Sequence, residues 1–267
     1  MSFETDGFLA KDWREFAENN LVTPETSALC RDLSRSIQRL VSEVKIVDAD
    51  SPIDPRFVAR LLILRALTNF QGAVILAEQG LGAEARTLAR SCLETAFCLA
   101  GVLSKKEVFV DLMLKDSAKH HNELAKHLLS LEGDNAVNSE LQLLLQDHLH
   151  QDKKGQWLAT RSLADASDLS DLYIFYRELS ADAHPTMISL LRYIEEDGDV
   201  IDFVWGPERD VSRVKEVMLL CCTFLVASGI AFNSEVAKND FVGEDLGKHW
   251  ISVQKLQGSG ASESQNS

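Results

Sequence analysis

The sequence predicts an all-α fold, an antiparallel helical bundle, and three observations carry this prediction. Long stretches place apolar residues at the three- and four-residue spacing of amphipathic helices. Only five prolines occur among 267 residues, and four of them fall at the boundaries of these stretches. The turns between the stretches are short, which favours helices that run antiparallel to their neighbours.

The first predicted helix covers residues 25–47, after Pro24. Its apolar positions recur at helical spacing: Leu29, Leu33, Ile37, Leu40, Val41 and Val44. The link "DADSPIDP" ends this helix. Ser51 or Asp54 is expected to cap the next one, with Pro55 tolerated in its first turn.

Two central helices are predicted next. Residues 56–79 are rich in Leu, Ala and Ile almost all the way round, which is typical of a buried helix. The stretch "QGLGAEA" predicts a tight turn, because Gly80 and Gly82 can adopt left-handed conformations. A third helix is expected over about 83–103.

A fourth helix, over 105–131, carries Val108, Leu112, Leu124 and Leu128 on one face. Residues 132–165 are polar and weakly periodic, so we expect a short helix near 138–149 and a mobile loop around "QDKKGQ". Another helix is predicted from Ser167 or Ser170 to about Ala183, and a further one starting at Pro185.

The C-terminal third completes the fold. An Asp-Gly turn between β-branched flanks predicts one small β-hairpin near 193–205, and a long helix is expected over 208–238. The resulting division is an N-terminal helical appendage over 1–50, a helical bundle over 55–240 and, from composition, a disordered tail over 256–267.

The formal charge of −14 argues against an extended DNA-binding surface or an anionic membrane as partner, since both require clustered Lys and Arg. An RNA or nucleotide at a small local site stays compatible with it. The five cysteines form no disulfide pattern and are expected to be reduced core residues. We expect no signal peptide, and the apolar run 217–232 is short for a membrane span. These observations predict a cytoplasmic protein.

One candidate site lies on the helix of residues 167–183. His184 lies seven positions after Arg177, which places the two within about 20° of one direction on a helix. Tyr173 and Ser180 point close to them, beside the apolar stripe. Arginine offers a fork of donors that suits phosphate oxygens, and histidine exchanges protons near neutral pH. The set could therefore bind and cleave a phosphodiester.

A second polar line occurs in "EARTLARSCLE", where Arg86, Arg90 and Glu94 recur at four-residue spacing. Arg90 and Glu94 can form an intrahelical ion pair. The simpler interpretation of both lines is a set of structural ion pairs or a solvated helix edge.

The two motifs together resemble an uncharacterised bacterial family of HEPN-like proteins. That family carries Arg-Ser-x-x-Glu, here Arg90, Ser91 and Glu94, followed much later by Ser-x-x-x-His-Pro, here Ser180, His184 and Pro185. The resemblance covers about residues 55–235 and implies a four- to five-helix bundle, often a homodimer. Many HEPN domains are metal-independent ribonucleases of toxin or phage-defence systems with an Arg-x(4–6)-His motif, which Arg177 and His184 satisfy.

The resemblance implies catalytic roles for Arg177 and His184, with Arg90 assisting in binding and Glu94 orienting an arginine. Arg86, Tyr173 and Ser180 complete the expected binding set. The alternative is a non-catalytic bundle that binds a protein partner or a nucleotide. In that case Arg177 is expected to be neutralised by Glu94 or by Glu178.

Metal and cofactor sites are not predicted. Asp116, His120, Glu123 and His127 share one helical face, but a di-iron bundle needs matching Glu-x-x-His motifs on two helices, and this chain has His-x-x-Glu once. No nucleotide-binding glycine motif or zinc knuckle occurs.

Overall fold

A computed structural model of the chain describes residue 8 and residues 22–46, 51–130, 158–167, 169–197, 200–203 and 210–263. It confirms the all-α helical bundle. The short helix near 138–149 and the loop around "QDKKGQ" that the sequence predicts lie outside the described residues.

The N-terminal half of the described chain contains four long helices: α3 (Pro24–Glu43), α4 (Pro55–Glu78), α5 (Gly82–Lys105) and α6 (Glu107–Ser130). Their limits follow from local chemistry. The Asp54 carboxylate accepts a hydrogen bond from the Arg56 amide at 2.8 Å and caps α4, with Pro55 in the first turn as predicted. Gly80 has φ = 76°, which lets the chain reverse between α4 and α5.

Shorter elements follow: α8 (Thr160–Ala166), the 3₁₀ turn η2 (Ser170–Leu172), α9 (Tyr173–Ala183), α10 (Met187–Leu190) and the 3₁₀ turn η3 (Leu191–Tyr193). Strands β1 (Ile194–Asp197) and β2 (Val200–Phe203) pair antiparallel with Ile194 opposite Phe203, which confirms the predicted hairpin. The helix expected to begin at Pro185 is reduced to the single turn of α10.

The C-terminal part contains α11 (Val211–Phe232), a π-helical turn η4 (Asn233–Ala237) and α12 (Asp240–Glu263). No helix is predicted from the sequence over the residues of α12, and the last turns of α12 fall within the predicted disordered tail over 256–267. Lys238, at φ = 50°, forms the reversal before α12, where Asn233 accepts a hydrogen bond from the Asn239 amide and donates one to the Asn239 carbonyl.

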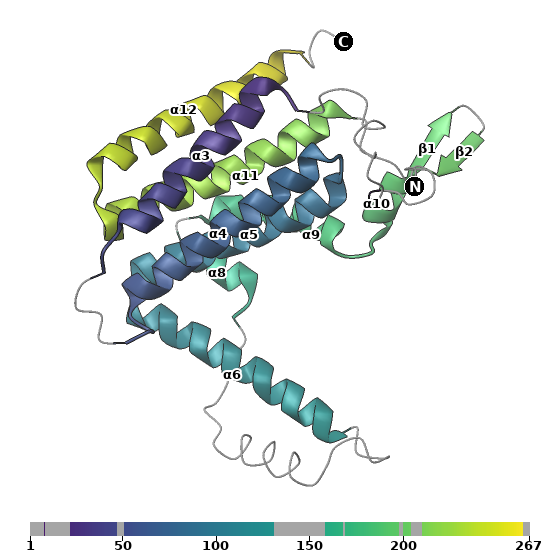
Figure 1. Cartoon of the computed structure of the whole chain (residues 1–267). Helices are drawn as coiled ribbons and strands as arrows, with labels where there is room; N and C mark the ends of the chain where they lie inside the picture. The colour runs from purple at the N-terminus through teal and green to yellow at the C-terminus, as the bar shows by residue number, and fades with distance from the viewer. Residues whose placement is uncertain are drawn as a thin grey trace.

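The helices α3, α4, α5, α11 and α12 lie side by side with roughly aligned axes, and α6 projects from one end of the bundle (Figure 1). The most buried helices are α5 and α11; α5 packs against α4, α9 and α11, while α11 also contacts α3 and α12. Residues of α3 such as Leu33 and Ile37 are fully buried in this same core. The domain division predicted above stays a prediction, with α3 contributing to the shared core.

Two described helices, Pro55–Glu78 and Val211–Ala237, are long and apolar enough to cross a membrane by length and composition alone. In the second, 67% of the apolar window is buried inside the bundle, which identifies a core helix. In Pro55–Glu78, only 33% of the corresponding apolar window is buried. Helix α4 therefore leaves much of an apolar surface uncovered by the described residues.

Candidate functional site

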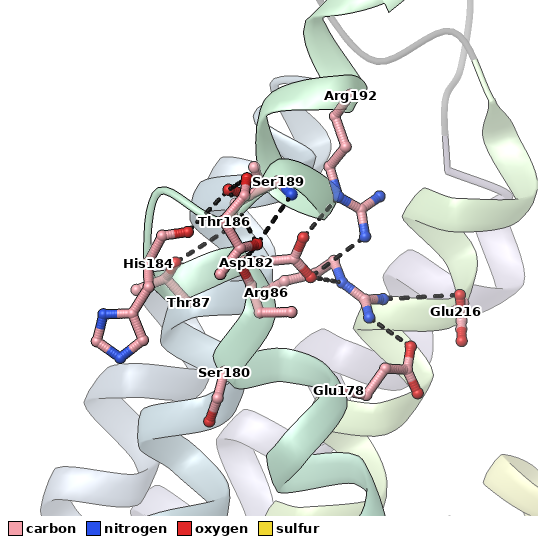
Figure 2. A network of polar contacts seen from close by, with 12 residues as sticks. Arg86, Thr87, Glu178, Ser180, Asp182, His184, Thr186, Ser189, Arg192 and Glu216 are labelled. Atoms are coloured by element: carbon pink, nitrogen blue, oxygen red, sulfur yellow. Dashed lines mark hydrogen bonds and ion pairs between the residues drawn. The ribbon is translucent and has the colours of Figure 1, made fainter.

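Arg86 stands at the centre of a polar network between α5 and α9 (Figure 2). Its side chain is 7% exposed, and its Nε donates to Asp182 Oδ2 at 2.5 Å while Nη2 donates to Glu178 Oε1 at 2.6 Å. Burial lowers the pKa of Arg86, but the hydrogen bonds to Asp182 and Glu178 more than offset this, so the pKa is raised. Arg86 thus stays charged inside the protein.

Asp182 is the most enclosed acid of this network, with 1% of its side chain exposed. Its Oδ1 also accepts from Arg192 Nε at 2.5 Å, so that one carboxylate joins an arginine of α5 to one of η3. Glu216 of α11 adds a longer ion pair to Arg86 at 3.8 Å. Helices α5 and α11 and the turn η3 are therefore all held at the C-terminal end of α9.

Arg90 forms a second cluster one helical turn along α5. Its Nε donates to Ser180 Oγ at 3.0 Å, and its Nη2 donates to Glu94 Oε1 and to Tyr176 Oη, both at 2.9 Å. The structure thus brings together Arg90, Glu94 and Ser180, three of the residues predicted for the site, and it contains the predicted Arg90–Glu94 pair.

Tyr173 belongs to an aromatic stack beside this cluster. Its ring stacks on Tyr176 with centroids 5.4 Å apart, and the Arg161 guanidinium of α8 lies 4.8 Å from its centroid. Arg90 lies 5.0 Å from the Tyr176 centroid. Cation–π contacts at this distance are attractive, so Tyr173 links α8 to α9 through contacts within the protein.

Arg177 and His184 differ from all these residues. Both are exposed, and in the part of the chain that the structure describes neither side chain has a hydrogen-bond or ion-pair partner. Glu94 and Glu178, the acids considered as neutralising groups for Arg177, bind Arg90 and Arg86 instead. Among the described residues, Arg177 and His184 therefore remain unpaired, on the same helix as the half-buried Ser180 and Tyr173.

The backbone around His184 is well fixed. His184 ends α9 with φ = −123° and ψ = 152°, the extended geometry that a following proline favours. Its carbonyl accepts hydrogen bonds from the Thr186 amide and the Ser189 hydroxyl, both at 2.7 Å. Figure 2 shows the imidazole pointing away from Arg86 and Asp182.

The profile of a protein family, DUF5677, matches residues 56–201, more than half of the chain. The chain belongs to this family. It is described as a family of unknown function. No curated protein and no solved structure matches the chain. The DUF5677 match runs from the start of α4 into β2, so it contains Arg86, Arg90, Arg177 and His184, while α3, α11 and α12 lie outside it.

Within this DUF5677 segment, the predicted binding residue Arg86 lies in a different environment from the other candidates. Arg86 is enclosed by carboxylates, because α9 covers the flank of α5 on which it lies, so its guanidinium donors are bound to Glu178 and Asp182. Asp182 was not singled out from the sequence. The signal was present, since Asp182 follows Phe175 and Leu179 at helical spacing on the core side of α9, where a carboxylate requires a charged partner.

The face of α6 that carries Asp116, His120, Glu123 and His127 does not form a metal site. Glu123 binds Lys119 at 2.8 Å and Lys126 at 3.3 Å, and among the described residues no three His, Cys, Asp or Glu side chains are placed to share a metal ion.

Proposed function

We propose that this chain is a HEPN-like, metal-independent endoribonuclease of toxin or phage-defence type, acting through Arg177 and His184. The observation that supports the proposal is the contrast in pairing. Arg86, Arg90 and Arg192 around α9 are bound to protein groups, whereas Arg177 and His184 are exposed and unpaired within the described residues. Free donors on a rigid helix and turn suit an anionic ligand.

The proposed reaction needs no metal. His184 accepts the proton of an RNA 2′-hydroxyl, and the resulting oxygen attacks the adjacent phosphorus. Arg177 donates hydrogen bonds to the non-bridging oxygens as negative charge develops. The bond from phosphorus to the 5′-oxygen breaks, and that oxygen takes a proton from the imidazolium or from water. The products are a 2′,3′-cyclic phosphate and a 5′-hydroxyl.

Arg90 supports this site in the proposal. Its hydrogen bond to Ser180 joins α5 to α9 at a position that lies between Arg177 and His184 in the sequence, and its bond to Glu94 orients its guanidinium. Two chains are proposed to bring their sites together as a homodimer in the cytoplasm.

The test is cleavage of a labelled oligoribonucleotide in EDTA by the parent protein, Arg177→Ala and His184→Ala. Matched controls are Arg35→Ala and His127→Ala, which remove exposed residues of the same types elsewhere. Each site variant is expected to lose activity by about a hundredfold or more, with both controls unchanged. Equal cleavage by all five proteins would point to a contaminant and overturn the mechanism.

A non-catalytic bundle that binds a protein partner or a nucleotide is the second candidate. The observation that favours it is charge: Glu178, with 52% of its side chain exposed, follows Arg177 directly, and the chain carries a formal −14. Acids beside a phosphate site weaken anion binding. Binding of the oligonucleotide with no cleavage, lost in Arg177→Ala, would support this candidate.

A further inference from the structure

A line of apolar side chains runs along the exposed side of α4. Phe57, Leu61, Leu64 and Ile75 are 36%, 51%, 41% and 53% exposed. Thr68 falls on the same line, and its hydroxyl donates to the Leu64 carbonyl at 2.9 Å, so its polar group is already satisfied. We call this line the α4 surface. It spans about 27 Å at 1.5 Å per residue.

The spacing of the α4 surface is that of a coiled-coil seam. Positions 57, 61, 64 and 68 alternate by four and three residues, which is the a/d pattern of a heptad repeat, and Ile75 follows 68 by one heptad. The intervening position is Gln71, which donates to Ser34 of α3 at 2.9 Å, so the free seam is continuous over 57–68. In this register Arg60 occupies position g and Arg65 position e. These are the positions whose charges select the partner of a coiled coil.

Three arginines border the α4 surface without partners among the described residues. Arg60 and Arg65 flank its first half, on opposite sides. Arg31 of α3 borders its second half, because it lies one turn from each of two contacts between α3 and α4: Ser27 with Glu78 at 3.1 Å and Ser34 with Gln71 at 2.9 Å. In a chain of net charge −14, this is a local concentration of free positive charge beside exposed apolar side chains.

We propose that the α4 surface is the docking site for an acidic amphipathic helix of a partner protein, which packs along α4 as in a coiled coil. The partner helix carries apolar residues at its own a and d positions and glutamate or aspartate at e and g, opposite Arg60 and Arg65. Burial of apolar side chains drives the association, and the charge pattern sets its specificity.

A second copy of this chain does not fit the same surface. A parallel α4 pair places Arg60 at g against Arg65 at e of the other copy, and an antiparallel pair places each arginine against its own equivalent. Both arrangements bring like charges together. An anionic bilayer fits poorly as well, because the whole chain is strongly acidic and an a/d seam is narrower than the apolar face of a membrane-surface helix.

The experiment uses the full chain and two synthetic three-heptad peptides with leucine at a and d, one with glutamate and one with lysine at e and g. Fluorescence anisotropy is expected to show binding of the glutamate peptide at micromolar concentration and none of the lysine peptide. The variant Arg60→Glu/Arg65→Glu is expected to bind the glutamate peptide more weakly than the parent, by roughly tenfold or more, and to bind the lysine peptide. The variant Leu61→Ala/Leu64→Ala is also expected to bind the glutamate peptide more weakly than the parent.

Arg35→Glu is the matched control, since Arg35 is an exposed arginine on another helix, and it is expected to bind like the parent. The proposal fails if the glutamate peptide does not bind, if both peptides bind the parent equally, or if the α4 variants leave binding unchanged. It also fails if sedimentation shows a dimer that Leu61→Ala/Leu64→Ala dissociates, or if the parent binds anionic vesicles in preference to the peptide.

Discussion

The polar side chains on the two sides of α9 differ in whether they bind other groups of the protein. On the side that faces α5, Asp182, Ser180 and Tyr176 all bind arginines. On the outer side, Arg177 and His184 are exposed and have no partner among the described residues. A buried carboxylate must be paired, because an isolated charge inside a protein is costly. An exposed arginine or histidine side chain is solvated by water and can exchange that water for a ligand. The difference therefore separates groups bound within the fold from groups available to a ligand.

The largest expected effect is the loss of stability when the network on the inner side of α9 is broken. Asp182→Asn removes the carboxylate that Arg86 and Arg192 share, and leaves Arg86 buried with reduced compensation. We expect a loss of about 3–5 kcal/mol in the free energy of unfolding, measured by urea denaturation followed by circular dichroism.

Two comparisons sharpen this prediction. Glu178→Gln is expected to change the free energy of unfolding by less than about 1 kcal/mol, since its side chain is half exposed. The double variant Arg86→Met/Asp182→Leu is expected to be more stable than Asp182→Asn, because it removes the buried Arg86 charge, while Arg192 and Glu178 lose a partner but keep access to water. If Asp182→Asn were as stable as the parent, the network would have no structural role.

The second effect concerns Arg90, which is partly buried with 22% of its side chain exposed. Arg90→Ala is expected to cost about 1–3 kcal/mol of unfolding free energy, since Ser180, Glu94 and Tyr176 lose a charged partner. Arg90→Lys keeps the charge but not the fork of donors, so we expect only part of the stability to return. Full recovery in Arg90→Lys would show that geometry is unimportant here.

A pH dependence provides a third test, at a polar contact away from α9. His249 Nε2 lies 2.9 Å from the Ser36 hydroxyl, and burial lowers the pKa of His249 from its ordinary value of 6.5. The unfolded chain therefore binds a proton more readily than the folded one. Stability from this contact is present above pH 6.5 and is lost as the pH falls through the lowered pKa.

The measurement is urea denaturation at several values between about pH 7.5 and pH 5, on the parent and on His249→Gln. The charged and polar groups around His249 are Asp245, Asp32 and Lys248, and all three stay in both proteins. We expect a shallower loss of stability in acid for His249→Gln. An unchanged slope would assign the acid sensitivity to other groups.

The smallest effects on stability are expected on the outer side of α9. Arg177→Ala and His184→Ala are each expected to change the free energy of unfolding by less than about 0.5 kcal/mol, because exposed residues without partners contribute little. A loss of 2 kcal/mol or more, on the order of a core substitution, in either variant would show that the outer side is also structural.

The starts of α3, α4 and α5 could be predicted closely from the sequence, because Pro24, Asp54 with Pro55, and Gly80 define them chemically. Helix α12 could not, since its C-terminal residues are rich in Gly and Ser and its stability comes from packing on α3 and α11. For the candidate site, helical spacing selects Arg90, Glu94, Arg177 and His184 as candidates, and their roles stay predictions. It could not show which neighbouring helix covers Arg86, because that depends on tertiary packing.

The central claim is that Arg177 and His184, on the outer side of α9, serve a ligand, while the network of Arg86, Asp182 and Arg192 on its inner side serves the fold. The most direct test measures RNA cleavage in EDTA and unfolding free energy on the same preparations of Arg177→Ala and Asp182→Asn. We expect Arg177→Ala to keep the parent's stability and to lose cleavage by about a hundredfold, and Asp182→Asn to lose several kcal/mol. Undiminished cleavage by Arg177→Ala, or a loss of stability matching that of Asp182→Asn, would contradict the account.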